Sequence, residues 1–265
     1  YPSLKNLIEF QIENNTDAII IAGTTGETAT LSNQEQIEII DFAVKEVDSR
    51  VPVIAGTGTN NTLETVYLSQ EAQKLGVDGL LIVTPYYNKS TQEGLYEHYE
   101  YIHEQTSLPI LLYNVPSRTN VHLDANTVYQ LSKLERIVGI KDASGDFSHL
   151  LEIKSLCDDD FVLYSGNDDQ IVPMLALGAQ GVISVLANIA PLDTHDMVME
   201  YLKGNHEKAL KLQVDYQKLI SLLFVEPSPI AFKYALHKMS FIDNVLRRPL
   251  TPLSDSYTDE ILMLM

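Results

Sequence analysis

The sequence predicts an α/β fold, a (β/α)8 TIM barrel whose first strand is missing from the sequence and which carries a C-terminal helical appendage. The 265 residues are close to the ~250 that such a barrel typically has. Apolar segments alternate with amphipathic helical stretches, and most are apolar throughout, as in strands that are covered on both faces of a parallel sheet. Their even spacing favours a barrel over a doubly wound sheet. These segments are residues 18–23, 52–56, 80–84, 109–114, 137–141, 161–166 and 181–185.

Signals for helix ends support this order of elements. A helical stretch at residues 4–14 opens the chain, so the strand expected to be absent is the first. Residues 32–35 and 90–93 both read Ser-x-x-Glu, which fits a capping box at a helix start. Gly76 and Gly178 stand where a left-handed helix end is expected before a strand.

After residue 185 the pattern becomes helical. We expect the barrel, with the catalytic site, to occupy residues 1–203 and a C-terminal helical domain to occupy residues 204–265. The helical stretches are residues 191–203, 206–224 and 229–239 and a last one from residue 255.

Composition excludes several classes of function. The net charge of −18 repels the phosphates of nucleic acids and anionic membranes. The single cysteine, Cys157, cannot form an internal disulfide. No apolar segment is long enough to span a bilayer, and residues 1–5 do not resemble a signal peptide. We therefore expect a cytoplasmic protein whose partners are small molecules.

Polar residues follow the predicted strands, at the barrel face where active sites lie. Among thirteen lysines, only Lys141 ends a buried strand. A desolvated amine there can attack a ketone and form a Schiff base, whose iminium withdraws electrons without a metal. The alternative is a structural lysine that reaches solvent or pairs with Asp142.

Other strand ends supply groups that suit an organic acid. Arg118 can bind a carboxylate with its planar guanidinium, and Thr24 and Thr25 can donate hydrogen bonds to a second one. Tyr87 and Tyr113 can exchange protons. Each also has a structural interpretation as a loop ion pair, a turn residue or a packed aromatic ring. The histidines show no metal-binding spacing and no nucleotide motif occurs, so we expect no metal and no cofactor.

Five motifs resemble the dihydrodipicolinate synthase (4-hydroxy-tetrahydrodipicolinate synthase) family of pyruvate-dependent class I aldolases. The resemblance covers residues 4–253 and implies condensation of pyruvate with L-aspartate 4-semialdehyde on the diaminopimelate route to lysine. It also implies a homotetramer made of two tight dimers. The motifs are GTTGE at 23–27, TPYYN at 84–88, YNVPSRT at 113–119, IKDASG at 140–145 and GVISV at 181–185.

The resemblance assigns roles to single residues. Lys141 forms the Schiff base, Tyr113 moves protons beside it, and Thr24 links Tyr113 to Tyr87 of a neighbouring subunit. Thr25 binds the pyruvate carboxylate and Arg118 binds that of the semialdehyde. Main-chain carbonyls near the reacting centre come from Gly166 and Ile183.

A lysine-binding regulatory site is also implied, at a cleft between subunits. Lysine-sensitive members commonly carry histidine at the positions of Asn33 and Gln36, so we expect weak or absent inhibition by lysine. Both residues can also be ordinary residues of a first helical turn. The positions of this site are Ala29, Asn33, Gln36, Asn60, Glu64 and Tyr86.

Two other functions remain open from the sequence. A related pyruvate aldolase, such as a sialic acid or keto-sugar-acid lyase, has the same lysine chemistry, but Arg118 favours a small carboxylated aldehyde. A catalytically silent paralogue that binds small acids or a protein partner would not need the intact set of Lys141, Tyr113, Thr24 and Arg118.

Overall fold

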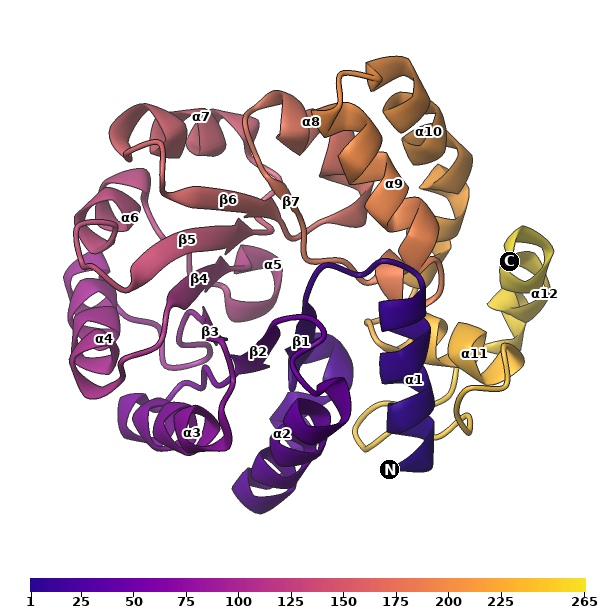
Figure 1. Cartoon of the computed structure of the whole chain (residues 1–265), viewed down its shortest axis with the longest axis horizontal. Helices are drawn as coiled ribbons and strands as arrows, with labels where there is room; N and C mark the ends of the chain where they lie inside the picture. Colours follow the sequence, from indigo (N-terminus) through magenta and orange to yellow (C-terminus); the bar gives the residue numbers. More distant parts are fainter.

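The computed structural model describes residues 1–265 and contains one parallel sheet of seven strands (Figure 1). The strands lie side by side in chain order, each hydrogen-bonded to its sequence neighbours, and helical segments connect them. The predicted α/β class and all seven predicted strands are confirmed. The strands are β1 (Ile19–Ile21), β2 (Val53–Gly56), β3 (Gly79–Val83), β4 (Ile110–Asn114), β5 (Ile137–Asp142), β6 (Val162–Ser165) and β7 (Gly181–Val182).

Helices surround the sheet and continue beyond it. None of them combines the length and apolar character needed to cross a membrane. The helices are α1 (Pro2–Glu13), α2 (Asn33–Val47), α3 (Thr62–Leu75), α4 (Gln92–Gln105), α5 (Pro116–Thr119), α6 (Ala125–Leu131), α7 (Phe147–Leu156), α8 (Ile171–Ala176), α9 (Pro191–Leu202), α10 (His206–Leu223), α11 (Ile230–Lys238) and α12 (Asp255–Leu264). Short 3₁₀ turns are η1 (Thr24–Gly26), η2 (Thr28–Thr30), η3 (Asp168–Gln170) and η4 (Leu186–Asn188).

The sheet curls but is not closed by hydrogen bonds. Figure 1 shows β7 coming round toward β1, while β1 pairs with β2 alone and β7 with β6 alone. The structure therefore shows a curled, open sheet of seven strands. Closure by an eighth strand between these two edges stays a prediction.

Local signals set several helix ends where the sequence predicts them. Ser32 and Glu35 form a complete capping box at the start of α2. Gly76 and Gly178 have φ angles of 87° and 93°, the left-handed conformation that glycine adopts without a steric penalty. The second capping box is wrong, because Thr91, not Ser90, caps α4, and its hydroxyl accepts from the amide of Gly94.

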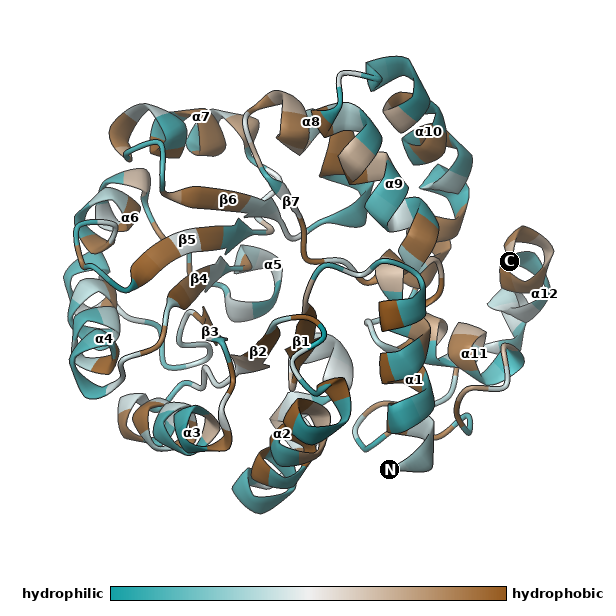
Figure 2. Ribbon diagram, viewed as in Figure 1, coloured by the Kyte–Doolittle hydropathy of each residue, from teal (hydrophilic) through white to brown (hydrophobic).

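The apolar core lies in separate layers. The largest cluster fills the space between the sheet and its outer helices, where Figure 2 shows apolar strands inside and polar outer helix faces. A smaller cluster lies on the concave face of the sheet and includes Leu81, Leu111 and Tyr113. Since in-register residues of parallel strands share a face, Lys141, the partner of Tyr113, also points to this concave side.

The C-terminal helices form a third cluster of their own. It joins α10, α11 and α12 to Leu186 and Ile189, which follow β7. Figure 1 shows α11 outside the sheet next to α1, with α12 farther out beyond α11. The division at residues 203 and 204 stays a prediction.

His98 on α4 gives a prediction for stability. It is 5% exposed, its Nδ1 lies 2.9 Å from Thr62 Oγ1, and burial lowers the pKa of His98 to about 4. An unfolded histidine titrates near 6.5, so on acidification the unfolded chain takes up this proton first. This contribution to folding is present above pH 6.5 and is lost as the pH falls toward 4. Urea unfolding should show that His98→Gln reduces the loss of stability between pH ~7 and ~5 by about 2 kcal/mol.

Burial also lowers the pKa of His103 and of His149, so these groups add to the loss on acidification in both proteins. The difference between the wild type and His98→Gln isolates His98. Equal pH dependence of the two proteins would contradict the prediction.

Candidate active site

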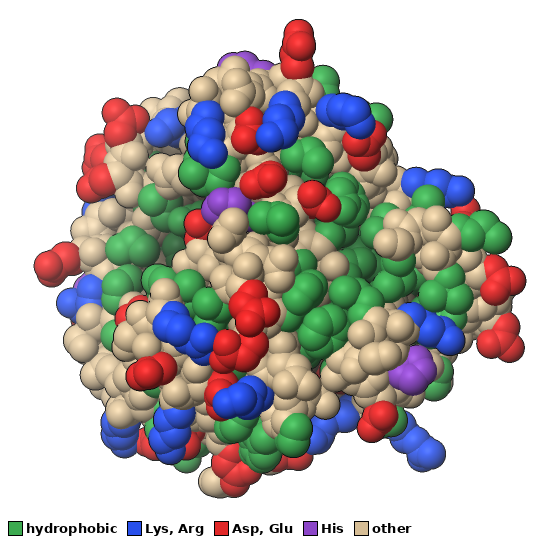
Figure 3. Space-filling view, turned by 45° about the vertical axis from the view of Figure 1, so that its right-hand side comes forward, with side chains coloured by type: hydrophobic (Ala, Val, Ile, Leu, Met, Phe, Trp, Pro, Cys, Tyr) green, Lys and Arg blue, Asp and Glu red, His purple; other side chains and the backbone are tan.

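A cavity of about 1150 Å³ runs along the concave face of the sheet, and its lining includes residues at the carboxyl ends of the strands. Hydrophobic side chains form much of its lining, and Figure 3 shows such side chains gathered in a recess of the surface. It brings together seven of the eight predicted catalytic and substrate-binding residues. These are Thr24, Thr25, Tyr113, Arg118, Lys141, Gly166 and Ile183.

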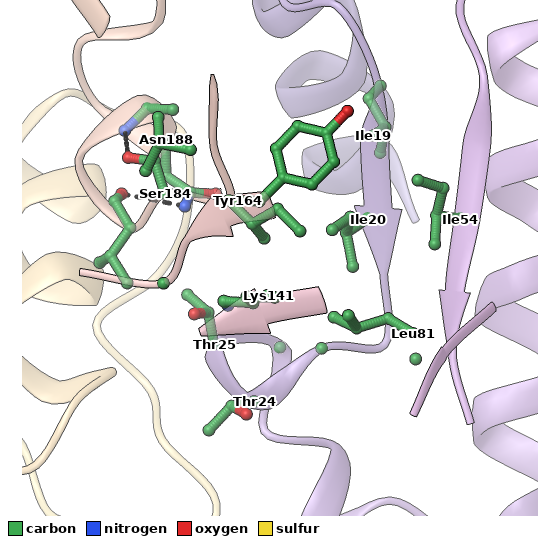
Figure 4. A pocket seen from close by; sticks show the side chains of 18 of the residues that line it. Ile19, Ile20, Thr24, Thr25, Ile54, Leu81, Lys141, Tyr164, Ser184 and Asn188 are labelled. Carbon is green, nitrogen blue, oxygen red and sulfur yellow. Dashed lines mark hydrogen bonds between the residues drawn. The ribbon is translucent and has the colours of Figure 1, made fainter. Parts of the chain in front are cut away.

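Lys141 and Tyr113 form the centre of the site. They are paired residues at the ends of β5 and β4, and Lys141 Nζ lies 4.2 Å from the centroid of the Tyr113 ring. On the other side, Lys141 pairs with Tyr164 of β6, whose phenol has a pKa raised by burial and by the charge of Asp17. The amine therefore lies beside the Tyr113 ring in a largely apolar cavity, and Figure 4 shows Lys141 and Tyr164 in that cavity.

Gly166 leaves the space that the lysine side chain occupies. A Cβ atom at residue 166 would lie 2.7 Å from the Cβ of Ala143 and 3.1 Å from Cε of Lys141. The amide of Gly166 donates to the carbonyl of Asp142 at 2.7 Å, which continues the pairing of β5 with β6. Any larger residue here would displace the amine.

The turn after β1 carries the two threonines. Thr24 and Thr25 lie in η1, and Figure 4 shows both in the same cavity as Lys141. Glu27, which follows this turn, has a φ of 58°, a left-handed conformation that is uncommon for a residue with a side chain. The turn is thus a defined backbone structure that brings two hydroxyls and their amides to the site.

Arg118 lies on the short helix α5 at the mouth of the cavity. Its guanidinium Nη2 donates to the carbonyl oxygen of Ser228 at 3.3 Å. Ser228 precedes α11, so the C-terminal part of the chain contacts the arginine from outside the sheet. The guanidinium remains exposed and can bind an anion at the entrance.

A buried polar network lies behind the ends of β4 and β5. Asn114 donates to Asp142 Oδ2 at 2.7 Å and accepts from the amide of Leu123 at 3.1 Å. The hydroxyl of Ser144 donates to Asp142 Oδ1, and His149 Nε2 lies 3.8 Å from Asp142 Oδ2. This network joins the strand ends that carry Tyr113 and Lys141. We therefore expect it to keep the distance between Tyr113 and Lys141 fixed.

Asp168, which follows β6, fixes the chain just after β7. Its buried Oδ2 accepts from the amides of Val185 and Leu186 at 3.0 and 2.9 Å, so it fixes the loop that follows Ile183. Burial raises the pKa of Asp168, while these bonds and the charge of Lys141 act in the opposite direction. The sequence places Asp168 at a strand end but assigns it no role.

Tyr87 is the predicted site residue that does not line the cavity. It lies in the loop after β3 with a φ of 71°, and 91% of its surface is exposed. An aromatic ring so exposed is available to another molecule. Its assignment to a neighbouring subunit stays a prediction.

Four residues of the predicted lysine site lie together, and the other two, Gln36 and Ala29, are not part of this group. Asn33 donates to the Glu64 carboxylate at 3.0 Å, and Tyr86 lies close enough to Glu64 and Asn60 for both to influence the pKa of its phenol, which burial raises. Gln36 instead points inward and donates to the carbonyl of Gly56 at 2.7 Å. Ala29 is exposed on η2.

No group of three or more His, Cys, Asp or Glu side chains is arranged to hold a metal ion. The polar groups of the cavity are an amine, a guanidinium, phenols and hydroxyls. This set can form a covalent bond to a carbonyl carbon, bind carboxylates and transfer protons.

Comparison with known proteins gives consistent similarities. Residues 2–265 match the Dihydrodipicolinate synthetase family. The 4-hydroxy-tetrahydrodipicolinate synthase 1 of Clostridium acetobutylicum is 50% identical over 255 residues, 96% of this chain and 87% of that protein. A monomeric dihydrodipicolinate synthase variant, 42% identical, has a TM-score of 0.97 over 99% of this chain and 89% of its own. The chloride-inhibited synthase of Acinetobacter baumannii complexed with pyruvate, also 42% identical, has a TM-score of 0.96 over 99% and 90%.

Proposed function

Because this chain belongs to the Dihydrodipicolinate synthetase family, we propose that it condenses pyruvate with L-aspartate 4-semialdehyde through a Schiff base on Lys141. This is the reaction of a 4-hydroxy-tetrahydrodipicolinate synthase, in the biosynthesis of diaminopimelate and lysine. The observation that carries the proposal is the placement of the Lys141 amine 4.2 Å from the centroid of the Tyr113 ring, in one cavity with Thr25 and Arg118.

The proposed chemistry starts at the ketone carbon of pyruvate. The amine of Lys141 adds to this carbon, water leaves, and an iminium forms. The iminium makes a methyl proton acidic, and its loss gives an enamine whose methylene carbon attacks the aldehyde of the second substrate. Tyr113 donates and accepts protons in these steps, connected through Thr24 to Tyr87 of a neighbouring subunit.

The other proposed roles concern binding. Thr25 holds the pyruvate carboxylate through its hydroxyl and amide, and Arg118 holds the carboxylate of the semialdehyde. The main-chain carbonyls of Gly166 and Ile183 face the reacting carbon atoms. We assign these roles from the family resemblance, and the shared cavity is what supports them.

Assembly and fold closure complete the proposal. A homotetramer made of two dimers would let Tyr87, 91% exposed in the single chain, reach the site of its neighbour. An eighth strand between β1 and β7 would close the sheet into a barrel and satisfy both open edges. Residues 1–203 would then form this catalytic barrel and residues 204–265 a helical domain.

A coupled assay with pyruvate and L-aspartate 4-semialdehyde tests the function directly. We expect turnover that depends on both substrates. Cleavage of a sialic acid or a keto-sugar acid without this condensation would indicate a lyase of the same chemistry. Absence of any pyruvate chemistry would indicate a silent paralogue.

Arg118 gives a prediction about the second substrate. Arg118→His removes the planar guanidinium, and hydrogen bonds to charged groups contribute about 1.5–3 kcal/mol each, so kcat/KM for the semialdehyde should fall by about 10- to 100-fold. Trapping of pyruvate by borohydride should remain, because Lys141 is unchanged. Steady-state kinetics with each substrate varied in turn measures both effects.

Arg50→His is a suitable control, because Arg50 pairs with Glu9 outside the cavity. It should leave both substrates unaffected. Loss of pyruvate trapping in Arg118→His would disprove the assigned role.

The lysine site gives a second prediction. Asn33 and Gln36 lack an imidazole, and Gln36 is bound to a backbone carbonyl inside the protein. Losing two contacts of ~0.5–1.5 kcal/mol each weakens lysine binding by roughly 5- to 150-fold. An inhibition curve should therefore have a midpoint above about 1 mM, and a lower midpoint would contradict the prediction. The double variant Asn33→His, Gln36→His should be inhibited more strongly than the wild type.

A further inference from the structure

We propose that Glu27 is a positioning residue, through which the C-terminal helices hold the substrate-binding turn at Thr24 and Thr25 in place. The inference rests on the proposed function, because it uses the role of Thr25 toward the pyruvate carboxylate. It gives the C-terminal segment a part in substrate binding. Neither the sequence of this segment nor its position, far along the chain from Thr24 and Thr25, indicates such a part.

Glu27 ends one 3₁₀ turn and begins the next. Its amide donates to the carbonyl of Thr24 at 3.1 Å, and its own carbonyl accepts from the amide and the hydroxyl of Thr30, both at 2.9 Å. Its left-handed backbone, with a φ of 58°, is a sparsely populated conformation for a residue with a side chain. Such a conformation persists where surrounding contacts fix it.

Those contacts come from the other end of the chain. Lys233 on α11 forms an ion pair with Glu27 Oε2, although the two residues are 206 positions apart. The amide of Arg247 donates to Glu27 Oε1 at 2.7 Å. Both carboxylate oxygens of Glu27 are therefore bound by the C-terminal segment.

The ion pair is shielded from water. The side chains of Glu27 and Lys233 are 10% and 17% exposed. In such surroundings a charge left without its partner is costly, so each residue restrains the other more strongly than a surface pair would. By comparison, Lys218 and Glu260 join α10 to α12 with side chains that are 64% and 46% exposed.

A second set of bonds fixes the following turn. The guanidinium of Arg247 donates to the carbonyl of Thr30 at 3.2 Å and to the Glu35 carboxylate at 2.6 Å. Glu35 belongs to the capping box of α2. The chain from residue 27 to residue 35 is thus attached to the C-terminal segment at three points.

The same helix also contributes to the cavity. Phe232 and Leu236, on either side of Lys233 in α11, line the cavity with Thr24 and Thr25. The carbonyl of Ser228, just before α11, accepts from Arg118. The segment of Ser228 and α11 therefore contacts the site both at the turn with Thr24 and Thr25 and at Arg118, and Lys233 contacts the turn through Glu27.

Lys233→Met tests the inference in the full chain. This variant keeps the length of the side chain but leaves Glu27 without its cation, so the turn should shift. Because a displacement of about 1 Å can cost ~100-fold, we expect KM for pyruvate to rise at least 10-fold and kcat to fall, with little change in KM for the semialdehyde. The half-saturating pyruvate concentration for borohydride trapping should rise in parallel.

Two matched variants separate positioning from general destabilisation. Lys218→Met breaks an exposed ion pair of the same C-terminal region and should leave both KM values unchanged. Lys233→Arg keeps the cation and should restore pyruvate binding. Equal rises in both KM values in Lys233→Met, or wild-type kinetics of that variant, would overturn the inference.

If Lys233→Met does not fold, Glu27→Gln replaces it. This variant removes the negative charge together with the need to neutralise it, and it should show the same selective rise of KM for pyruvate. Wild-type values for Glu27→Gln would overturn the inference. Failure of the proposed function is distinguishable, because the wild-type protein would then neither trap pyruvate nor turn over the two substrates.

Discussion

Lys141→Ala is expected to abolish both the covalent capture of pyruvate and turnover. Incubation with pyruvate and borohydride should add one reduced pyruvyl group to the wild-type protein, located at Lys141 by peptide mass spectrometry. The variant lacks the only amine at the end of a buried strand, and no other lysine lines the cavity. Because the lost amine is the proposed covalent nucleophile, we expect kcat to fall by roughly 10⁴- to 10⁶-fold.

Lys133 offers a close control for this experiment. Its Nζ lies 4.7 Å from the centroid of the Tyr129 ring, which resembles the geometry of Lys141 and Tyr113, but it pairs with Asp158 on the surface. Lys133→Ala should keep both adduct and activity. Labelling of any lysine other than Lys141 would disprove the assignment.

Tyr113→Phe is expected to have the second-largest effect. The substitution removes a hydroxyl and keeps the ring beside Lys141, so KM for pyruvate should change little. If the phenol transfers protons during the reaction, kcat should fall by ~10²–10⁴-fold. Steady-state kinetics with both substrates, together with borohydride trapping, measures these effects.

Tyr164→Phe provides the comparison, because Tyr164 is the strand partner of Lys141 on β6, as Tyr113 is on β4. Burial raises the pKa of its phenol, which makes proton exchange at neutral pH less favourable. This variant should retain far more activity than Tyr113→Phe. Equal losses in the two variants would show that packing beside the lysine, not proton transfer, explains the effect.

The sequence predicts the strands well but not all of their ends. Strand β1 ends at Ile21 because Ala22 adopts a left-handed conformation with a φ of 56°. Strand β7 covers residues 181–182 of the predicted 181–185, because the amide of Val185 donates to Asp168 and not to a neighbouring strand. The end of β1 depends on a local backbone conformation and that of β7 on a tertiary contact, and a hydrophobic pattern contains neither.

The residues that meet in the candidate site could be predicted from one rule of parallel barrels. Strand ends of a parallel barrel meet at one face, and that rule brings Lys141, Tyr113 and Thr25 together from the sequence alone. The partners that hold them were not predictable. Lys233 looks like an ordinary helix residue, and its contact with Glu27 follows only from how α11 packs against the first turn.

If this contact positions the turn at Thr24 and Thr25, it also sets when the site is completed during synthesis. Glu27 leaves the ribosome 206 residues before Lys233, an interval of about 10–40 s at typical elongation rates of ~5–20 residues per second. Until then the turn at Thr24 and Thr25 lacks Lys233, whereas neighbouring strands, which are close in sequence, can already pair. Contacts so distant in sequence also form slowly in folding. A nascent or truncated chain can therefore contain every residue that we propose to contact pyruvate and still lack the contact that we propose to hold the turn.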